Sequence, residues 1–298
     1  MRRSLVVLAL LIATGGLLVP PASARPTAPA GVRVTSGIVY GQGEVNAPAP
    51  GQADLLLDLY EPVERSDGRR PLVVLIHGGG FTGGSRTNED LVRIARSLAA
   101  AGDVVASIDY RLAPQDPEPS PRVATAAAAV PLNVPVLKAM VAAIDDTLTA
   151  LDWLLDHHQE LRIHRNRIGL VGSSAGAITA DHVAYALDDL GIDAPRIRFV
   201  GDLWGGIFIP LDLAAAATQL DDGEAALFAV HGGSDPTVPV QLDDWLVAEA
   251  RREGVPVEYL RVEGAGHGFR ATGFFTREVS AGQTAFDRML AFADDALG

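Results

Sequence analysis

Residues 169–176 read GLVGSSAG, an apolar run that ends in a serine surrounded by small residues. Residues 172–176 fit the pattern G-x-S-x-G, with Ser174 at its centre. Glycines at both ends of this pattern allow the backbone to reverse sharply beneath an exposed serine, between a strand and a helix. A serine hydroxyl becomes a strong nucleophile only beside a base. The motif therefore predicts catalysis only if a histidine, an acid and an oxyanion hole are found elsewhere in the chain.

Short apolar runs alternate with longer helix candidates on both sides of this turn. Runs that are apolar at nearly every position are typical of strands buried on both faces, so we expect a mostly parallel sheet with helices on both of its faces. Residues 32–40 and 53–60 add two strands that pair antiparallel, joined by a Gly- and Pro-rich turn over residues 41–51. The parallel strands are expected at residues 72–76, 104–108, 168–171, 197–201, 227–230 and 257–262, and the helices at residues 88–101, 137–158, 175–187, 240–253 and 281–297.

The N-terminal segment has the three parts of a secretory signal peptide: two arginines, an apolar run over residues 5–19, and small residues that end at Ala24. We expect cleavage after Ala24 and a secreted protein. A membrane anchor is the alternative, but the apolar run is shorter than the roughly 20 residues that a spanning helix needs, so stable membrane insertion is not expected. Residues 25–31 then form a Pro/Ala linker, and residues 32–298 form a single domain.

The composition excludes several kinds of chemistry. The 298 residues include no cysteine, which excludes disulfide scaffolds, thiol catalysis and cysteine-bound metals. The formal net charge is −13, and a negative field of this size repels nucleic acid and anionic membranes. We therefore expect no nucleic-acid partner. The sequence does not predict the oligomeric state.

A glycine-rich segment follows the first parallel strand. Residues 77–81 read HGGGF, and consecutive glycines allow backbone N–H groups to approach an anion closely because no Cβ intervenes. Together with the amide of the residue after the nucleophile, such a loop predicts an oxyanion hole formed by the N–H groups of Gly79, Gly80 and Ala175. The alternative interpretation is a tight turn without a chemical role.

An acid and a base follow the last two strands of the predicted sheet. Asp235 stands in the turn HGGSDP after one strand, and His267 stands between small residues in GAGHGF after the other. Asp202, which follows an earlier strand, is the competing acid, but its neighbours LWGG resemble a pocket wall, so we prefer Asp235. The order Ser174, Asp235, His267 is the order of nucleophile, acid and base in one large group of serine hydrolases.

The other histidines favour structural roles. None of them forms an i, i+4 pair with a nearby glutamate, so a metal site is not expected, and no cofactor is needed. The ring of His77 is expected to brace the glycine loop. Surface, capping or structural roles are expected for the remaining five, which are His157, His158, His164, His182 and His231.

Residues 114–135 interrupt the alternation of strands and helices with six prolines and an Ala-rich piece. We expect a short lid-like insertion over the carboxyl edge of the sheet, where ligands bind in open α/β folds; a surface excursion is the alternative. Four aromatic residues are candidates for the substrate pocket, although each is also a candidate for the core: Phe81, Trp204, Phe208 and Phe269.

Taken together, these segments carry a family resemblance. The chain resembles the α/β-hydrolase superfamily, and within it the carboxylesterases of the hormone-sensitive-lipase-like and feruloyl-esterase-like groups. It departs from them at Ser173, where the lipase-like group usually has an acidic residue, and in the insertion at residues 114–135, where those relatives usually have a compact loop. The matching motifs, in order along the chain, are HGGGF (77–81), DYRLAP (109–114), GSSAG (172–176), GGSDPTVP (232–239) and GAGHGF (264–269).

The resemblance implies a serine carboxylesterase with the α/β-hydrolase fold. In such an enzyme His267 takes the proton of Ser174, Asp235 holds the imidazole tautomer, and the oxyanion hole receives the developing charge. The implied substrates are small-molecule or polymeric esters with short or medium acyl chains. A lipase or a polyester or plant-wall esterase of the same fold is the alternative. A peptidase is disfavoured because no anchor for a substrate amine is visible, and a non-catalytic binding module because the triad is complete.

Overall fold

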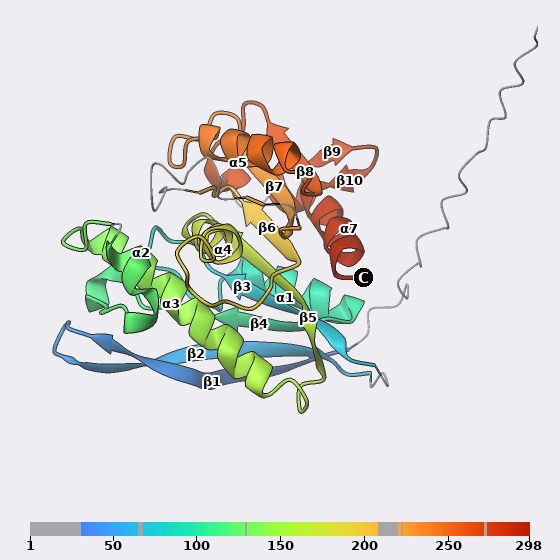
Figure 1. Ribbon diagram of the computed structural model, residues 1–298. Coiled ribbons are helices and arrows are strands. Elements are labelled where there is room, and N and C mark those ends of the chain that lie inside the picture. The colour runs from blue at the N-terminus through green and yellow to red at the C-terminus, as the bar shows by residue number, and fades with distance from the viewer. Residues whose placement is uncertain (1–30, 65–67, 129, 208–219, 222, 271–272) are drawn as a thin grey trace, which may run out of the picture.

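An eight-stranded sheet lies at the centre of the computed structural model, which describes residues 31–64, 68–128, 130–207, 220–221, 223–270 and 273–298 (Figure 1). The strand order is β1-β2-β4-β3-β5-β6-β7-β8. Neighbouring strands from β4 across to β8 run parallel, whereas β1 and β2, and β2 and β4, pair antiparallel. The predicted mostly parallel sheet is therefore confirmed. The strands are β1 (Val32–Val45), β2 (Gly51–Pro62), β3 (Arg70–Ile76), β4 (Val104–Ile108), β5 (Ile163–Ser173), β6 (Phe199–Leu203), β7 (Ala226–Gly232) and β8 (Val257–Val262).

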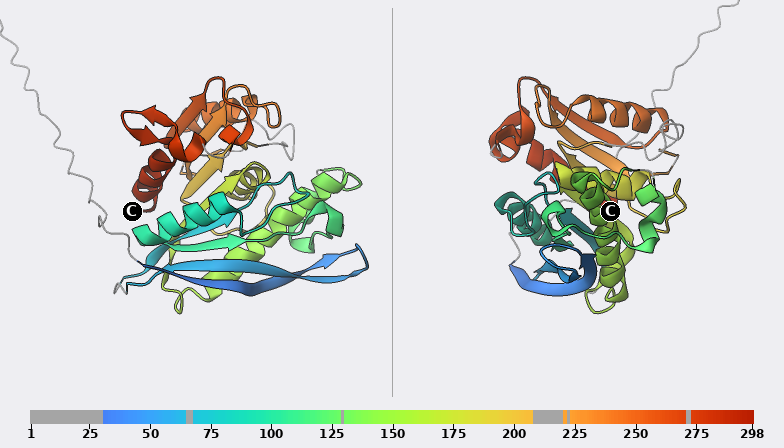
Figure 2. Two further views of the ribbon diagram at one scale, coloured as in Figure 1. Left: turned by 180° about the vertical axis from the view of Figure 1, so that it is seen from behind. Right: turned by 90° about the vertical axis from the view of Figure 1, so that its left-hand side faces the viewer.

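Helices cover both faces of this sheet, as the apolar runs predicted (Figures 1 and 2). Alternate residues of β3 point to opposite sides: Val73 packs with α1 and α7, whereas Val74 packs with α3 and α4. Strands β4 and β7 are buried at every position because both of their faces are covered. The helices are α1 (Glu89–Ala101), α2 (Ala124–Ala128), α3 (Pro135–Asp156), α4 (Ala175–Tyr185), α5 (Gln241–Arg252), α6 (Gly273–Thr276) and α7 (Ala285–Leu297), and the shorter elements are η1 (Ala113–Gln115), η2 (Pro121–Val123), η3 (His267–Arg270), β9 (Glu278–Ser280) and β10 (Gln283–Thr284).

The turn predicted at residues 41–51 is wrong, because β1 and β2 continue through most of it. Strand β1 runs on to Val45, and only residues 46–50 connect the two strands. Gly41 lies inside β1 where α3 crosses it, and a Cβ at this position would lie 2.7 Å from Thr149 Cγ2. This glycine therefore permits close packing of a helix on the strand rather than a turn.

The helix predicted at residues 281–297 begins only at Ala285. The residues before it pair in the small β9–β10 hairpin, and Thr284 caps the helix. Its Oγ1 accepts a hydrogen bond from the backbone N–H of Asp287 at 3.1 Å, while its own N–H donates to Asp287 Oδ2 at 2.9 Å. The reciprocal pair satisfies two amides at the helix N-terminus and fixes its first residue.

Residues 114–135 are packed against α3 and the tip of the β1–β2 hairpin. Pro117 forms a bridge with Val45, and Val123 and Ala126 are fully buried in the core on the α3 side. The alternative of a surface excursion is therefore wrong for the described part of this segment. Its last residue belongs to α3, which begins at Pro135.

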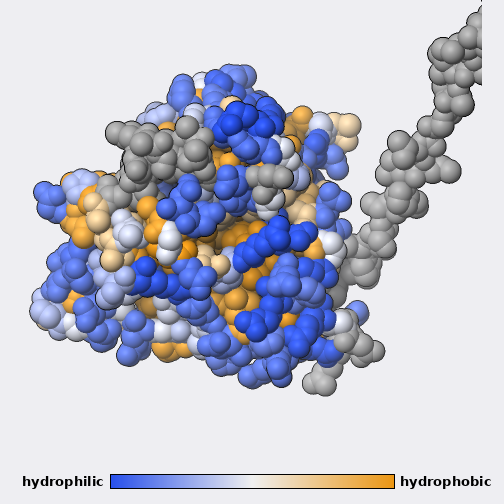
Figure 3. All heavy atoms as spheres, in the orientation of Figure 1, coloured by the Kyte–Doolittle hydropathy of each residue, from blue (hydrophilic) through white to orange (hydrophobic). Residues whose placement is uncertain are grey.

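The predicted signal peptide, residues 1–24, lies outside the described residues, as does most of the predicted linker. Among the described residues, no helix is long and apolar enough to cross a bilayer. Hydrophilic side chains cover most of the face drawn in Figure 3, with smaller groups of apolar side chains between them. The large apolar side chains that remain exposed in the described part of the chain are Val39, Val63, Val134 and Val136.

Candidate active site

Ser174 lies in a sharp turn between the carboxyl end of β5 and the first residue of α4. Its backbone has φ 53° and ψ −119°, a conformation that L-residues rarely adopt. The turn is so tight that a Cβ at Gly172 would collide with the carbonyl group of Gly176, and a Cβ at Gly176 would collide with Ile76 O of the neighbouring strand β3. The two glycines of the motif are therefore needed for close backbone approach.

His267 and Asp235 lie in line with Ser174. His267 Nε2 is 2.9 Å from Ser174 Oγ, and His267 Nδ1 is 2.7 Å from Asp235 Oδ2. Because a carboxylate only accepts hydrogen bonds, Nδ1 carries the proton and Nε2 is free to take the proton of the serine hydroxyl. The three residues come from the ends of β5, β7 and β8, which meet at the carboxyl edge of the sheet. The structure thus brings together the three side chains that the sequence predicted.

The Asp235 carboxylate is held in its charged form. Burial raises its pKa, but hydrogen bonds from the backbone N–H of Thr237, from His267 and from the backbone N–H of Val238 together outweigh burial, so its pKa lies below the usual value. Thr237 N and Val238 N donate to Oδ1 at 2.7 and 3.0 Å. One carboxylate oxygen is therefore occupied by the backbone, and the other is left for imidazole.

Asp202, the competing acid, does not contact His267. It lies within β6, which ends at Leu203, rather than in a loop after the strand as the sequence predicted. Its side chain is completely buried and accepts a hydrogen bond from Gly205 N at 2.7 Å. The strand begins two residues later than expected, at Phe199, which makes Asp202 its fourth residue. All five residues of this strand are buried, so the side chain of Asp202 lies in the interior.

Two of the three residues predicted for the oxyanion hole line the cavity beside Ser174, and the third follows Ser174 directly in the chain. Gly79 and Gly80 have positive φ, 119° and 59°, and line the same cavity as Ser174. Within the described residues, neither N–H donates a hydrogen bond to the backbone. Ala175 is the first residue of α4, where amides have no partner inside the helix and the helix dipole is positive. The three amides therefore remain candidates for an oxyanion hole.

The DYRLAP segment (residues 109–114) holds the glycine loop in place. Tyr110 stacks on His77 with ring centroids 4.2 Å apart and donates a hydrogen bond to His77 O at 2.9 Å. His77 is buried, its Nδ1 lies 2.7 Å from Gly78 O, and burial lowers its pKa. In the described part of the chain, no group of three or more His, Cys, Asp or Glu side chains could hold a metal ion. The contacts of His77 with Tyr110 and Gly78 indicate that it braces the glycine loop.

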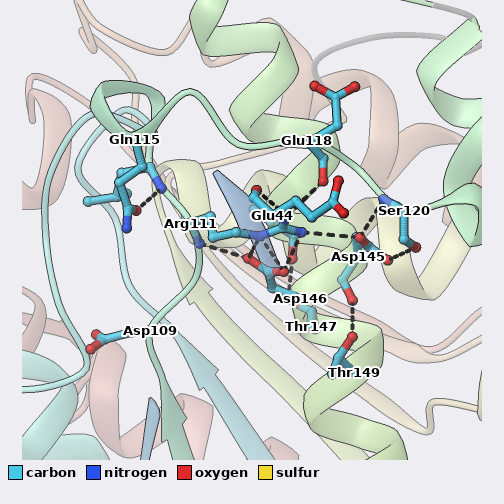
Figure 4. Close-up of polar contacts among 12 residues, drawn as sticks. Glu44, Asp109, Arg111, Gln115, Glu118, Ser120, Asp145, Asp146, Thr147 and Thr149 are labelled. Atoms are coloured by element: carbon cyan, nitrogen blue, oxygen red, sulfur yellow. Dashed lines mark hydrogen bonds and ion pairs between the residues drawn. The ribbon is translucent and has the colours of Figure 1, made fainter. Parts of the chain in front are cut away.

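Arg111 of the same segment lies in a buried ion-pair network that the sequence analysis missed (Figure 4). Its guanidinium donates to Asp146 Oδ1 at 2.7 Å and to Asp145 Oδ2 at 3.1 Å, both on α3. Burial raises the pKa of Asp146 to about 6, opposed by the hydrogen bonds from Arg111. Ser120 N and Oγ donate to Asp145 as well, at 2.9 and 2.7 Å. The network fastens the start of the 114–135 segment to α3.

A cavity of about 450 Å³ opens beside Ser174, and its walls are more apolar than polar. Of the four predicted pocket residues, Trp204 lines it, and Phe269 packs edge-on against Trp204 with ring centroids 5.6 Å apart. Phe81 lies beside Tyr110 in the interior and does not line the cavity, and Phe208 lies outside the described residues. The lining residues are Gly78, Gly79, Gly80, Gly84, Asn88, Asp90, Leu91, Ile94, Ser173, Ser174, Leu203, Trp204, Thr237, His267 and Phe274.

The cavity walls include three apolar residues that sequence reasoning missed: Leu91 and Ile94 of α1, and Phe274 of α6. The apolar face of α1 predicted a buried helix, but no signal in the sequence showed that its first turns reach the site. None of the described residues of the 114–135 segment lines this cavity. The expectation of a lid over the site is therefore not met by those residues.

Comparison with known proteins agrees with this fold. Residues 57–130 match the model of the BD-FAE family, and residues 138–209 match a family model described as alpha/beta hydrolase fold. Among solved structures, esterase 2 of Thermogutta terrifontis phosphorylated by paraoxon is similar at a TM-score of 0.63 and 22% identity, over 89% of this chain and 92% of that one. This chain therefore has the α/β-hydrolase fold, as the sequence motifs predicted.

Several of the similar curated proteins are named as esterases, and others as a lipase and a probable N-octanoylanthranilate hydrolase. Esterase LipI of Mycobacterium tuberculosis is 30% identical over 57% of this chain and 47% of its own length. Carboxylesterase NlhH of the same organism is 32% identical over 47% of this chain and 37% of its own length. The chain thus spans less than half the length of either relative. The predicted resemblance to carboxylesterases of the α/β-hydrolase superfamily is confirmed.

Proposed function

We propose that this protein is a secreted serine hydrolase that cleaves carboxylic esters of short or medium acyl chains through a covalent acyl-enzyme. The observation that carries the proposal is the unbroken hydrogen-bonded line from Ser174 Oγ through His267 to Asp235, with distances of 2.9 and 2.7 Å. The esterases to which the chain is similar support the same chemistry.

The proposed reaction follows from the hydrogen-bond roles of the two ring nitrogens of His267. His267 Nε2 takes the proton from Ser174 Oγ while the oxygen bonds to the ester carbonyl carbon. The carbonyl oxygen becomes negative and accepts hydrogen bonds from the N–H groups of Gly79, Gly80 and Ala175; loss of one such donor costs about 3 kcal/mol of barrier. The imidazolium then gives its proton to the leaving alcohol. Water then attacks the acyl-enzyme while His267 takes its proton, and the imidazolium returns that proton to Ser174 Oγ as the carboxylic acid is released. No step needs a cofactor.

The volume and the lining of the cavity support a short or medium acyl group. A volume of about 450 Å³ must hold the reacting ester as well as the acyl chain, and its apolar walls suit a short or medium chain. An interfacial lipase would need a mobile apolar cover. The described part of the insertion buries Val123 and Ala126 and exposes Val134, and none of its described residues lines the cavity, which favours an esterase over a lipase.

The experiment is hydrolysis of p-nitrophenyl esters from acetate to laurate by the chain beginning at Arg25, with Ser174→Ala as the matched control. We expect hydrolysis that is highest for the short esters, falls with chain length and is lost in the control. A folded wild-type protein that cleaves none of these esters would contradict the proposal. A maximum at laurate together with activation by an oil surface would instead support a lipase.

Secretion is a part of the proposal that rests on residues 1–24 alone. The charged start, the apolar run and the small residues before Arg25 support export and cleavage. Expression of the full chain in a bacterial host, followed by N-terminal sequencing of the extracellular or periplasmic protein, is expected to give Arg25 as the first residue. Retention of Met1 on a protein found inside the cell would contradict export.

A further inference from the structure

The cavity beside Ser174 has one acidic residue in its wall. Of the described residues that line it, Asp90 is the only one with a carboxylate, and none has an ammonium or guanidinium group. Asp90 lies in the first turn of α1 and is partly buried. Ile94, one helical turn further on, lines the same cavity, so the acid lies on the face of α1 that forms the wall.

The carboxylate of Asp90 has no hydrogen-bond or ion-pair partner in the part of the chain that the structure describes. An acid in the first turn of a helix often accepts from the free backbone N–H groups there, but Asn88 already does so. Asn88 Oδ1 accepts from the N–H groups of Asp90 and Leu91 at 3.0 and 3.3 Å. The cap of α1 is therefore complete without the Asp90 side chain.

The cation closest along the helix is held elsewhere. Arg93, three residues after Asp90, lies over the ring of Phe275, with its guanidinium carbon 4.2 Å from the ring centroid. Phe275 does not line the cavity. Arg93 is also exposed to solvent, so it screens Asp90 only in part. The negative charge of Asp90 is left for a group that enters the cavity.

The surroundings of Asp90 favour a cation as that group. Burial raises the pKa of Asp90, Arg93 opposes this, and Glu89 adds to it. The charge is thus less well solvated than that of an exposed acid, and a cation beside it is bound more strongly. Trp204 and Phe274 line the same cavity, and the faces of aromatic rings attract cations. The net charge of −13 favours the approach of cations as well.

We propose that Asp90 is a specificity-determining residue that selects esters carrying an ammonium group. The inference rests on the proposed function and names its substrate class, cationic esters. The ammonium group lies against the Asp90 carboxylate between apolar walls while Ser174 attacks the ester carbonyl. A carboxylate can hold a quaternary ammonium, which has no N–H group, through charge alone, so the test separates charge from hydrogen bonding.

Two pairs of esters of equal shape test the proposal, with acid release followed by titration at neutral pH. Acetylcholine and 3,3-dimethylbutyl acetate differ only in the nitrogen or carbon at the centre of the branched end, on the alcohol side. The p-nitrophenyl esters of 4-(trimethylammonio)butyric and 5,5-dimethylhexanoic acid differ in the same way on the acyl side. The ratio of kcat/KM for the cationic ester to that for the neutral ester measures the preference for charge.

Asp90→Asn removes the charge and keeps the shape, and Glu89→Gln is the matched control. Glu89 has the same charge in the same turn of α1, but it is exposed and does not line the cavity. We expect Asp90→Asn to lower the ratio by about 3- to 10-fold in at least one pair, and Glu89→Gln to change it by less than about twofold. Asp90→Ser, which also suits the first turn of a helix, is expected to repeat the effect of Asp90→Asn.

A ratio that Asp90→Asn leaves unchanged in both pairs would overturn the proposal, and so would an equal fall in Asp90→Asn and Glu89→Gln. The first result would be that of an acid that binds only hydroxyl groups, because an amide binds them too. The second would be that of a general field at the start of α1.

Binding to the Ser174→Ala protein separates this inference from the proposed function. Calorimetric titration with the same four esters is expected to give a Kd for one cationic ester that rises by about 3- to 10-fold when Asp90→Asn is added, while the Kd of its neutral partner changes by less than about twofold. Such a result with a wild-type protein that hydrolyses no ester would refute the proposed function alone. Failure of both cationic esters to bind, or binding that does not depend on Asp90, would overturn the inference even if wild type is an active esterase.

Discussion

Replacing Asp235 by asparagine tests the site directly, because the surrounding hydrogen bonds dictate how the amide sits. Thr237 N and Val238 N donate to Oδ1 of Asp235 at 2.7 and 3.0 Å. Asparagine keeps both bonds only if its amide oxygen takes the Oδ1 position. Its NH₂ group then faces His267 Nδ1, from which the carboxylate oxygen Oδ2 now lies 2.7 Å away.

The reversed amide forces the wrong tautomer on His267. An NH₂ donor requires Nδ1 to accept, so the ring proton moves to Nε2, which lies 2.9 Å from Ser174 Oγ and must be free to take the hydroxyl proton. The variant also loses the negative charge that stabilises the imidazolium. We expect kcat to fall by roughly 1,000- to 10,000-fold, which corresponds to about 4 to 5.5 kcal/mol of barrier.

The assay is p-nitrophenyl ester hydrolysis, with Asp202→Asn as the matched control and thermal unfolding to verify both folds. Asparagine at position 202 keeps an acceptor for Gly205 N, now bonded at 2.7 Å, and offers an NH₂ donor to the neighbouring acid. Its kcat is expected to fall by less than about tenfold. A folded Asp235→Asn protein with kcat within about tenfold of wild type would refute both the choice of acid and the tautomer argument.

Two further predictions concern stability. Gly176→Ala places a Cβ against Ile76 O and 2.7 Å from His77 O, so we expect the free energy of unfolding to fall by about 2 kcal/mol or more and kcat to fall as well. Gly83→Ala is the control, because no atom lies within 4 Å of its Cβ, and its free energy of unfolding is expected to stay within about 0.5 kcal/mol of wild type. Equal melting temperatures would contradict this. Burial raises the pKa of Asp181, so the folded state keeps a proton that the unfolded state releases above about pH 4, and stability falls by about 1.4 kcal/mol per pH unit up to the folded pKa. Asp181→Asn is therefore expected to flatten the pH dependence of the unfolding free energy in urea titrations; an unchanged slope would contradict the raised pKa.

The sequence predicted most of the sheet because buried parallel strands are apolar at nearly every position. The strands at residues 104–108 and 257–262 have the predicted bounds. The prediction was wrong at Gly41, because glycine occurs both in turns and at points of close packing inside strands. Gly41 indicated a turn, but it lies in β1, where the absence of a side chain lets Thr149 of α3 approach. Only the packing partner, which comes from a distant part of the chain, distinguishes these two uses of glycine.

The candidate site was predictable where the chemistry depends on short motifs, and unpredictable where it depends on packing across the molecule. Ser174, Asp235 and His267 each stand in a turn after a strand, and parallel strands bring such turns to one edge. Ile94 lines the cavity because of how α1 lies on the sheet, which no local pattern encodes.

The row of side chains from Ser174 through His267 to Asp235 has groups of opposite charge at its two ends. At one end, the first amide of α4 and the loop amides of Gly79 and Gly80 present positive dipoles around Ser174. At the other end, the Asp235 carboxylate is kept charged by three hydrogen-bond donors, two from the backbone and one from the imidazole of His267. In the proposed reaction, Ser174 Oγ bonds to the ester carbonyl carbon as its proton moves to His267, which creates a negative carbonyl oxygen at the first end and a positive ring at the second. Both charges therefore develop where fixed groups of the opposite sign already stand, and little reorganisation is needed as they form.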